Sequence, residues 1–204
     1  MCWSCVFPYL LDANMRAPAL MQARRRLLGA ARGRVLELGS GTGTNFPLYR
    51  APVESVDAVE PSARLARLAR RRLAEASVPI NVHDGVGESL AFADETFDVV
   101  VLTLTLCSVQ DPDRVLAETR RVLKGDGRLL LLEHGLSPDA RIARWQRRLN
   151  PLNRWLGEGC ELLRAPLALT AASGFDPEEH AEYYLPGVPR VGGYVAEARL
   201  AKAA

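Results

Sequence analysis

Three glycines stand close together in the segment VLELGSGTG, directly after a short apolar run. Gly39, Gly41 and Gly43 permit a tight turn and let a ligand approach the backbone closely. A dinucleotide-binding G-x-G-x-x-G loop would need its third glycine where this chain has Thr44. Glu37 also precedes the first glycine by two positions. The loop therefore predicts a nucleoside site of another kind, and an NAD-dependent oxidoreductase is a distant alternative.

A second carboxylate, Glu60, ends the next predicted strand, 21 residues after Gly39. In open parallel sheets a carboxylate at this place accepts hydrogen bonds from ribose hydroxyls. The alternative is an acidic residue that only favours the helix starting at Pro61. We expect the ribose role because Glu60 occurs together with the glycine loop.

His134 is the residue best suited to move a proton. It ends a predicted strand at the edge of the sheet where the glycine loop is also expected. It ends an apolar run, and imidazole titrates near neutral pH. We expect a general base or a substrate contact, and the alternative is a histidine that binds only backbone. Cys107, Cys160 and Asn14 are further candidates for lining the substrate pocket, although a small buried residue is the simpler interpretation of Cys107.

The cysteines give no sign of a metal centre or a disulfide framework. The chain has four, Cys2, Cys5, Cys107 and Cys160, which fits reduced thiols in a reducing compartment. Cys2 and Cys5 form a single C-x-x-C pair, with no second pair or nearby histidine to complete four ligands. We therefore expect no metal site.

Length and charge limit the class of protein. A chain of 204 residues fits one domain, and 48% hydrophobic with 25% charged residues is typical of a globular protein. The net charge of +2 argues against a nucleic-acid binder. The apolar start lacks a basic segment and a cleavage site, and no run reaches the ~18 apolar residues that span a bilayer. We expect a cytoplasmic protein.

Strands and helices must alternate to bring these residues to one edge. Apolar runs predict strands at 35–38, 97–106 and 128–134. Further strands are expected at 55–60 and 80–83 and, around the turn from Pro186 to Pro189, at 179–185 and 192–200. Capping residues and helical spacing predict helices from Ser62 to Ala76, Asp111 to Leu123, Ser137 to Asn150, and over 166–173. Helical crossovers imply a mainly parallel sheet. The last two strands are joined by too few residues for a crossover and are expected to be antiparallel at one edge.

In their order, four segments resemble the motifs of class I S-adenosylmethionine-dependent methyltransferases: VLELGSGTG (35–43), AVEP (58–61), ESLAFADETFDVVV (88–101) and RVLKGDGRLLLLEH (121–134). The resemblance covers roughly residues 33–135. It implies a Rossmann-like α/β fold, a seven-stranded, mainly parallel sheet with helices on both faces and an antiparallel last strand. It also implies S-adenosyl-L-methionine as the cofactor and S-adenosyl-L-homocysteine as its product.

The same resemblance assigns the residues that hold the cofactor. It places Glu37 and the glycines beside the methionine part, Glu60 on the ribose, and residues 85–87 beside adenine. Many relatives carry an Asp where this chain has Val86, so we expect backbone groups and apolar packing to hold the adenine. The residues expected to bind the cofactor are Glu37, Gly39, Ser40, Gly41, Gly43, Asn45, Glu60, Pro61, Gly85, Val86, Gly87, Thr103 and Leu104.

Further segments are similar to the thiol S-methyltransferase subfamily: FPYLL near the start, LTLCSV (104–109), LLEHG (131–135) and EGCELLR (158–164). This resemblance implies in-line methyl transfer to the thiol of a small hydrophobic acceptor. A phospholipid amine or a quinone-like hydroxyl is the alternative acceptor. A non-catalytic nucleoside-binding module is the alternative from another class. Those relatives carry an N-terminal membrane anchor, of which only the apolar segment 1–11 stands here.

We expect a single domain over 1–204, made of a helical lid (1–32), a cofactor-binding core (33–135), and cap helices with C-terminal strands (136–204). In segment 140–156 the apolar residues Ile142, Trp145, Leu149 and Leu152 follow one side and arginines take other positions. We expect this apolar stripe to turn inward over the site. The alternative is a basic helix on a membrane surface, a peripheral membrane contact. Apart from a membrane surface, we expect a small-molecule acceptor as the binding partner. The sequence does not predict the oligomeric state.

Overall fold

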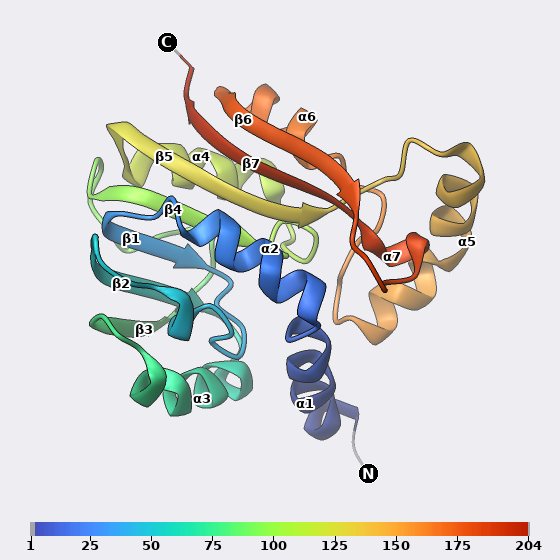
Figure 1. Cartoon of the computed structure of the whole chain (residues 1–204), viewed down its shortest axis with the longest axis horizontal. Helices are drawn as coiled ribbons and strands as arrows, with labels where there is room; N and C mark the ends of the chain where they lie inside the picture. The colour runs from blue at the N-terminus through green and yellow to red at the C-terminus, as the bar shows by residue number, and fades with distance from the viewer. Residues whose placement is uncertain (1–2, 204) are drawn as a thin grey trace.

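The computed structural model describes residues 3–203 and confirms the expected sheet (Figure 1). Its seven strands lie in the order β3-β2-β1-β4-β5-β7-β6. β7 runs antiparallel to both β5 and β6, and the other neighbours are parallel. The strands are β1 (Gly33–Leu38), β2 (Val53–Glu60), β3 (Ile80–Asp84), β4 (Phe97–Thr103), β5 (Leu123–His134), β6 (Phe175–Tyr184) and β7 (Tyr194–Lys202).

Helices cover both faces of this sheet, as the alternating pattern predicted (Figure 1). They are α1 (Trp3–Met15), α2 (Pro18–Leu28), α3 (Ala63–Arg72), α4 (Pro112–Val122), α5 (Ala140–Leu156), α6 (Pro166–Ala172) and α7 (Arg190–Gly193), with 3-10 turns at Phe46–Leu48 and Leu73–Glu75. Two of the predicted caps are confirmed, because Ser62 accepts a hydrogen bond from Leu65 N and Asp111 accepts one from Arg114 N. The helix expected to start at Ser137 is instead capped by Asp139, which accepts a hydrogen bond from Arg141 N.

Two apolar cores lie on the two faces of the sheet. Successive strand residues point to opposite faces, so Val35 joins the core beneath α2 while Leu36 joins the core beneath α4. Strands buried on both faces read as continuous apolar runs, which is why the sequence showed them clearly. The expected C-x-x-C pair lies outside the residues whose side chains are described. Within residues 3–203, no helix combines the length and the apolar character needed to cross a bilayer.

Three predicted strand boundaries were wrong by three residues or more. β6 starts at Phe175 rather than at residue 179, and the other two lie in β4 and β5. β4 ends at Thr103 rather than at residue 106, because Leu104 adopts a left-handed backbone with φ of 56°. β5 starts at Leu123 rather than at residue 128, because residues 124–127 continue the strand. Its pairing with β4 shifts register between Phe97 and Val99. The sheet edge that carries the functional residues is unchanged by these differences.

The orientation of α5 is also a correction. The helix does not stop at Asn150 but continues through Pro151 to Leu156. Its predicted inward stripe faces outward, with Trp145 52% and Leu152 51% exposed. Ala143, Gln146 and Asn150 are buried instead. The physical reason is the neighbouring loop 157–162, whose backbone groups need polar partners that the other face of α5 supplies.

Candidate active site

The glycine loop after β1 combines close packing with one open position. A Cβ at Gly39 would lie 2.6 Å from Thr105 Cγ2, and one at Gly43 would lie 2.9 Å from the Phe46 ring. At Gly41 the nearest atom to such a Cβ is 3.9 Å away, so this glycine faces free space. Ser40 Oγ is buried and has no hydrogen-bond partner among the described residues. The loop therefore presents backbone and an unpaired hydroxyl to a ligand.

Glu60 lies against this loop, as the sequence predicted. Its carboxylate accepts hydrogen bonds from Gly41 N at 2.7 Å and from Ser62 N at 2.9 Å. Burial raises the pKa of Glu60, while these two amides oppose the effect. A carboxylate has about four lone-pair sites, so two acceptor sites remain for the hydroxyls of a ribose.

Glu37 lies at the end of β1, fully buried beneath the loop. Tyr49 donates its hydroxyl to one carboxylate oxygen at 2.7 Å, and Asn45 Nδ2 donates to the other at 3.1 Å. Burial raises the pKa of Glu37 to about 7, against the opposing effects of Tyr49, Arg24 and Asn45. A carboxyl group that ionises near neutrality is thus held next to the loop.

Arg24 on α2 is a buried residue of the site that the sequence analysis missed. Its guanidinium donates to Asn45 Oδ1 at 2.7 Å and to Thr103 Oγ1 at 2.9 Å. Its Nε is buried without a hydrogen-bond partner in the described part of the chain. A signal was present, because Arg24 shares the apolar stripe with Leu20 and Leu27. The arginine therefore brings a positive charge, with spare donor capacity, under the methionine end of the predicted site.

α1 is tied over the glycine loop by polar contacts. Asp12 accepts from Thr42 Oγ1 at 2.6 Å and from both terminal nitrogens of Arg72 at 2.6 and 2.8 Å. Burial alone would raise the pKa of Asp12, but Arg72 and Thr42 lower it. Arg72 also donates to Thr42 O at 2.7 Å. The segment expected as a lid, residues 1–32, thus has two parts. α1 covers the glycine loop, whereas α2 packs on the sheet.

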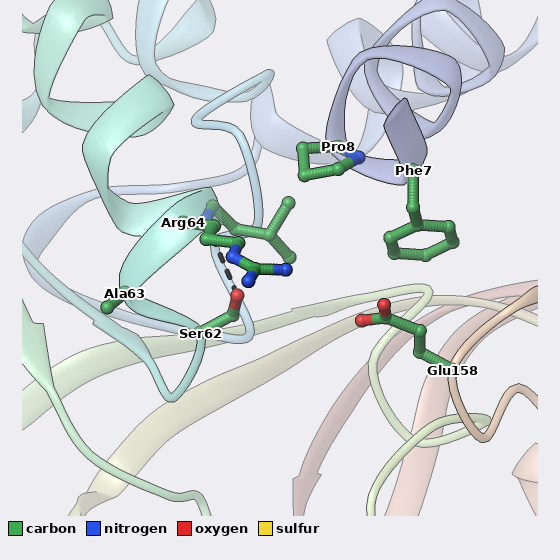
Figure 2. Close-up of a pocket in the computed structure, with 7 residues that line it drawn as sticks. Phe7, Pro8, Ser62, Ala63, Arg64 and Glu158 are labelled. Carbon is green, nitrogen blue, oxygen red and sulfur yellow. Dashed lines mark hydrogen bonds between the residues drawn. The ribbon is translucent and has the colours of Figure 1, made fainter. Parts of the chain in front are cut away.

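A pocket of about 270 Å³ opens between α1 and the start of α3. Figure 2 shows Phe7 and Pro8 of α1 on one side, the start of α3 on the other, and Glu158 below. The remaining lining residues are Ser62, Ala63, Arg64 and Leu65. Because Ser62 follows Glu60 by two positions, this pocket lies next to the expected ribose position.

The residues expected around adenine lie in the loop after β3. Gly85 and Gly87 flank Val86, which is 45% exposed, and Pro61 is exposed as well. Thr103 ends β4, and Leu104 follows it at the same edge. The positive φ of Leu104 is a strained conformation for a branched side chain, and such strain concentrates at functional sites.

Three of the four candidate residues on the substrate side form one cluster. His134 Nε2 lies 2.9 Å from Cys160 Sγ, and Cys160 Sγ lies 3.8 Å from Cys107 Sγ. Cys107 and His134 are buried, and Cys160 is partly exposed. The contact with Cys107, and then burial, raises the pKa of the Cys160 thiol well above its usual range. Asn14, by contrast, is exposed on α1 and does not join the cluster.

Neighbouring side chains fix the backbone around both cysteines. The buried Glu133 accepts hydrogen bonds from Thr105 N at 2.5 Å and Leu106 N at 2.8 Å, and burial raises its pKa. Arg164 donates to Leu106 O and, at 2.8 Å, to Val109 O. Asn153 on α5 donates to Cys160 O at 2.7 Å. The sulfur atoms are therefore held in position by groups outside the cluster.

This fold and this loop agree with the comparisons with known proteins. A methyltransferase-domain family model matches residues 36–131. Thiol S-methyltransferase TMT1B of Rattus norvegicus is 37% identical over an alignment of 186 residues that covers 80% of this chain and 74% of that protein. A phosphatidylethanolamine N-methyltransferase of Cereibacter sphaeroides is 32% identical over 132 residues, 64% of each chain.

Among solved structures, an S-adenosylmethionine-dependent methyltransferase from Thermotoga maritima has a TM-score of 0.68 at 23% identity. The match covers 98% of this chain and 100% of that one, and it supports the fold. The chain belongs to the class I S-adenosylmethionine-dependent methyltransferases. It is accordingly a methyl-transferring enzyme that uses S-adenosyl-L-methionine, and the buried Ser40 hydroxyl and the open Gly41 fit that cofactor.

Proposed function

We propose that this enzyme transfers the methyl group to the thiol of a small hydrophobic acceptor. The observation that carries the proposal is the cluster of His134, Cys107 and Cys160 at the ends of β4 and β5. The cluster lies at the C-terminal edge of the parallel strands, the edge at which the glycine loop follows β1. An acceptor bound there would therefore lie next to the cofactor. The similarity to thiol S-methyltransferase TMT1B supports the same acceptor class.

The chain's own residues would hold and align the two reactants. Glu60 takes the ribose, the loop from Gly39 to Gly43 takes the methionine part, and α1 closes over both as the lid. When bound, the cofactor supplies a methyl group on a sulfonium, with S-adenosyl-L-homocysteine as the leaving group. His134 contacts the acceptor and helps its thiol to ionise. A thiol with a pKa near 8.5 needs only little help to do so.

A second acceptor class, a phospholipid amine, has one observation in its favour. The exposed stripe of α5 combines Trp145, Leu149 and Leu152 with arginines, and the helix carries no acidic residue. A basic helix with an apolar face binds at the surface of anionic membranes. We therefore include peripheral membrane contact in the proposal, which suits a hydrophobic acceptor of either class. The free thiols Cys107 and Cys160 favour a reducing, cytoplasmic setting.

A panel of acceptors separates these hypotheses. The enzyme is incubated with methyl-labelled cofactor and matched thiols, amines and phenols, and products are identified by mass spectrometry. Labelled thioether from the thiols alone supports the proposal, and labelled amine as the sole product contradicts it. Cofactor binding without transfer to any acceptor would support a non-catalytic nucleoside-binding module instead. Glu60→Ala serves as the control, because its loss of cofactor affinity must lower product formation from every acceptor.

A further inference from the structure

We propose that Cys107, Cys160 and His134 form a three-ligand zinc site whose fourth position receives the sulfur of the acceptor. The inference rests on the proposed thiol acceptor and states how the thiol is activated. It assigns His134 a role as metal ligand in place of the general base expected from the sequence. It also replaces the expectation of no metal, which considered only Cys2 and Cys5.

The distances within the cluster suit zinc. One ligand atom from each residue, a ring nitrogen of His134 and the two Sγ atoms, lies within 4.8 Å of the others. In a tetrahedral site with Zn–S bonds of about 2.3 Å, two sulfurs stand about 3.8 Å apart. The two Sγ atoms are 3.8 Å apart here. His134 Nε2 now lies 2.9 Å from Cys160 Sγ. In a tetrahedral zinc site this distance between nitrogen and sulfur would be longer by roughly 0.6 Å, so the imidazole would move away from Cys160 by that amount.

The ligand set selects the metal and the type of site. Two thiolates and one imidazole are the soft and intermediate ligands that favour zinc over magnesium or calcium. Three protein ligands with one free position are the arrangement of catalytic zinc sites, whereas structural sites use four. Two thiolates also neutralise the charge of Zn²⁺, so the buried centre carries no net charge before the acceptor binds.

The surroundings hold the backbone of the two cysteine ligands, whereas His134 Nδ1 is buried with no hydrogen-bond partner among the described residues. Glu133 binds the amides of Thr105 and Leu106, which fixes the turn that carries Cys107. Asn153 binds the carbonyl of Cys160 from α5. Such outer contacts orient the ligands of metal centres. Cys160, the least buried of the three, marks the side from which an ion and an acceptor can enter.

The transfer balances with this site. The acceptor thiol loses its proton to solvent and binds zinc as a thiolate, because a metal-bound thiol is deprotonated. A lone pair on that sulfur forms the new sulfur–methyl bond. The bond between the methyl group and the sulfonium breaks, and its electron pair stays on the departing sulfur. The products are a methyl thioether and S-adenosyl-L-homocysteine, and the metal is unchanged.

The test measures metal binding directly on the full chain. The protein is stripped with a chelator and titrated with Zn²⁺ against a chromophoric competitor, and a Co²⁺ titration records the visible absorption of thiolate-bound cobalt. We expect one zinc per chain and cobalt–thiolate absorption in the wild type, and the loss of both in Cys107→Ser and Cys160→Ser. S-adenosylhomocysteine binding by these variants verifies that they are folded.

The double variant Cys2→Ser/Cys5→Ser is the matched control, because it removes the other cysteine pair. Zinc binding that disappears in this variant but persists in Cys107→Ser would overturn the proposed site. A stripped enzyme that methylates thiols at the wild-type rate would overturn the zinc role and leave the thiol function standing. Zinc bound at the cluster without methylation of any thiol would overturn the thiol function and, with it, the role given to the metal.

Discussion

Glu37 makes the stability of this protein depend on pH in a direction that can be measured. Its pKa is raised by burial from the ordinary 4.5 to about 7 in the folded protein. Between these values the folded chain binds a proton at Glu37 that the unfolded chain has released. The stabilisation is therefore fully present below pH 4.5 and is lost as the pH rises through about 7.

The size of the effect follows from the same two values. Each pH unit corresponds to about 1.36 kcal/mol, so the interval from 4.5 to about 7 amounts to about 3 kcal/mol. Glu37→Gln removes the ionisation and keeps the shape, since the amide can accept from Asn45 and donate to Tyr49. We expect similar stability of the two proteins below pH 4.5 and a more stable variant by about 3 kcal/mol at pH 8.

Urea unfolding without cofactor, followed at several pH values between 4.5 and 8, measures this difference. Glu54→Gln is the matched control, because Glu54 is exposed and its replacement should leave the pH dependence as in the wild type. Parallel stability profiles of wild type and Glu37→Gln would refute the argument that the buried carboxyl titrates in this interval. Isothermal titration with S-adenosylhomocysteine adds a second check, since an ionised Glu37 next to the ligand's ammonium should tighten binding as the pH rises through about 7.

Three further predictions concern the cofactor and the surface. Glu60→Ala should weaken S-adenosylhomocysteine binding in calorimetry by about 1.5–3 kcal/mol, because a charged acceptor for the ribose is lost; unchanged affinity would remove the ribose role. Asp12→Asn should weaken the contact between α1 and Arg72, raising the cofactor dissociation constant roughly 5- to 10-fold and speeding proteolysis within α1; equal proteolysis rates would argue against a lid. Trp145→Ala with Leu152→Ala should abolish co-sedimentation with anionic vesicles and spare turnover of a water-soluble thiol; undiminished sedimentation would contradict the membrane contact.

The parts of the fold that the sequence predicted are those set by neighbouring residues. The glycine loop, the caps Ser62 and Asp111, and the apolar strands are local patterns, and the structure has them where they were expected. Strand ends were harder, because the end of β4 depends on a backbone strain at Leu104 that no residue type announces. A leucine gives no hint of a left-handed conformation, unlike a glycine.

The sequence predicted which residues belong to the substrate side, but it did not predict that they contact one another. Cys107, His134 and Cys160 stand 27 and 26 residues apart, which matches no metal-binding spacing. The sheet brings the first two to one edge, and the loop after α5 brings the third. Arg24 was missed for a different reason, since a charge on an apolar stripe looks like an interruption unless a buried polar partner is known.

The reversed orientation of α5 connects the reaction centre with the surface. Its polar face binds the loop of Cys160 through Asn150 and Asn153, so any movement of the helix moves a residue of the cluster. Its apolar face is exposed. If that face rests on a membrane, a hydrophobic acceptor dissolved in the lipid lies one helix away from the cluster. Contact with the surface and placement of Cys160 would then be two functions of one helix.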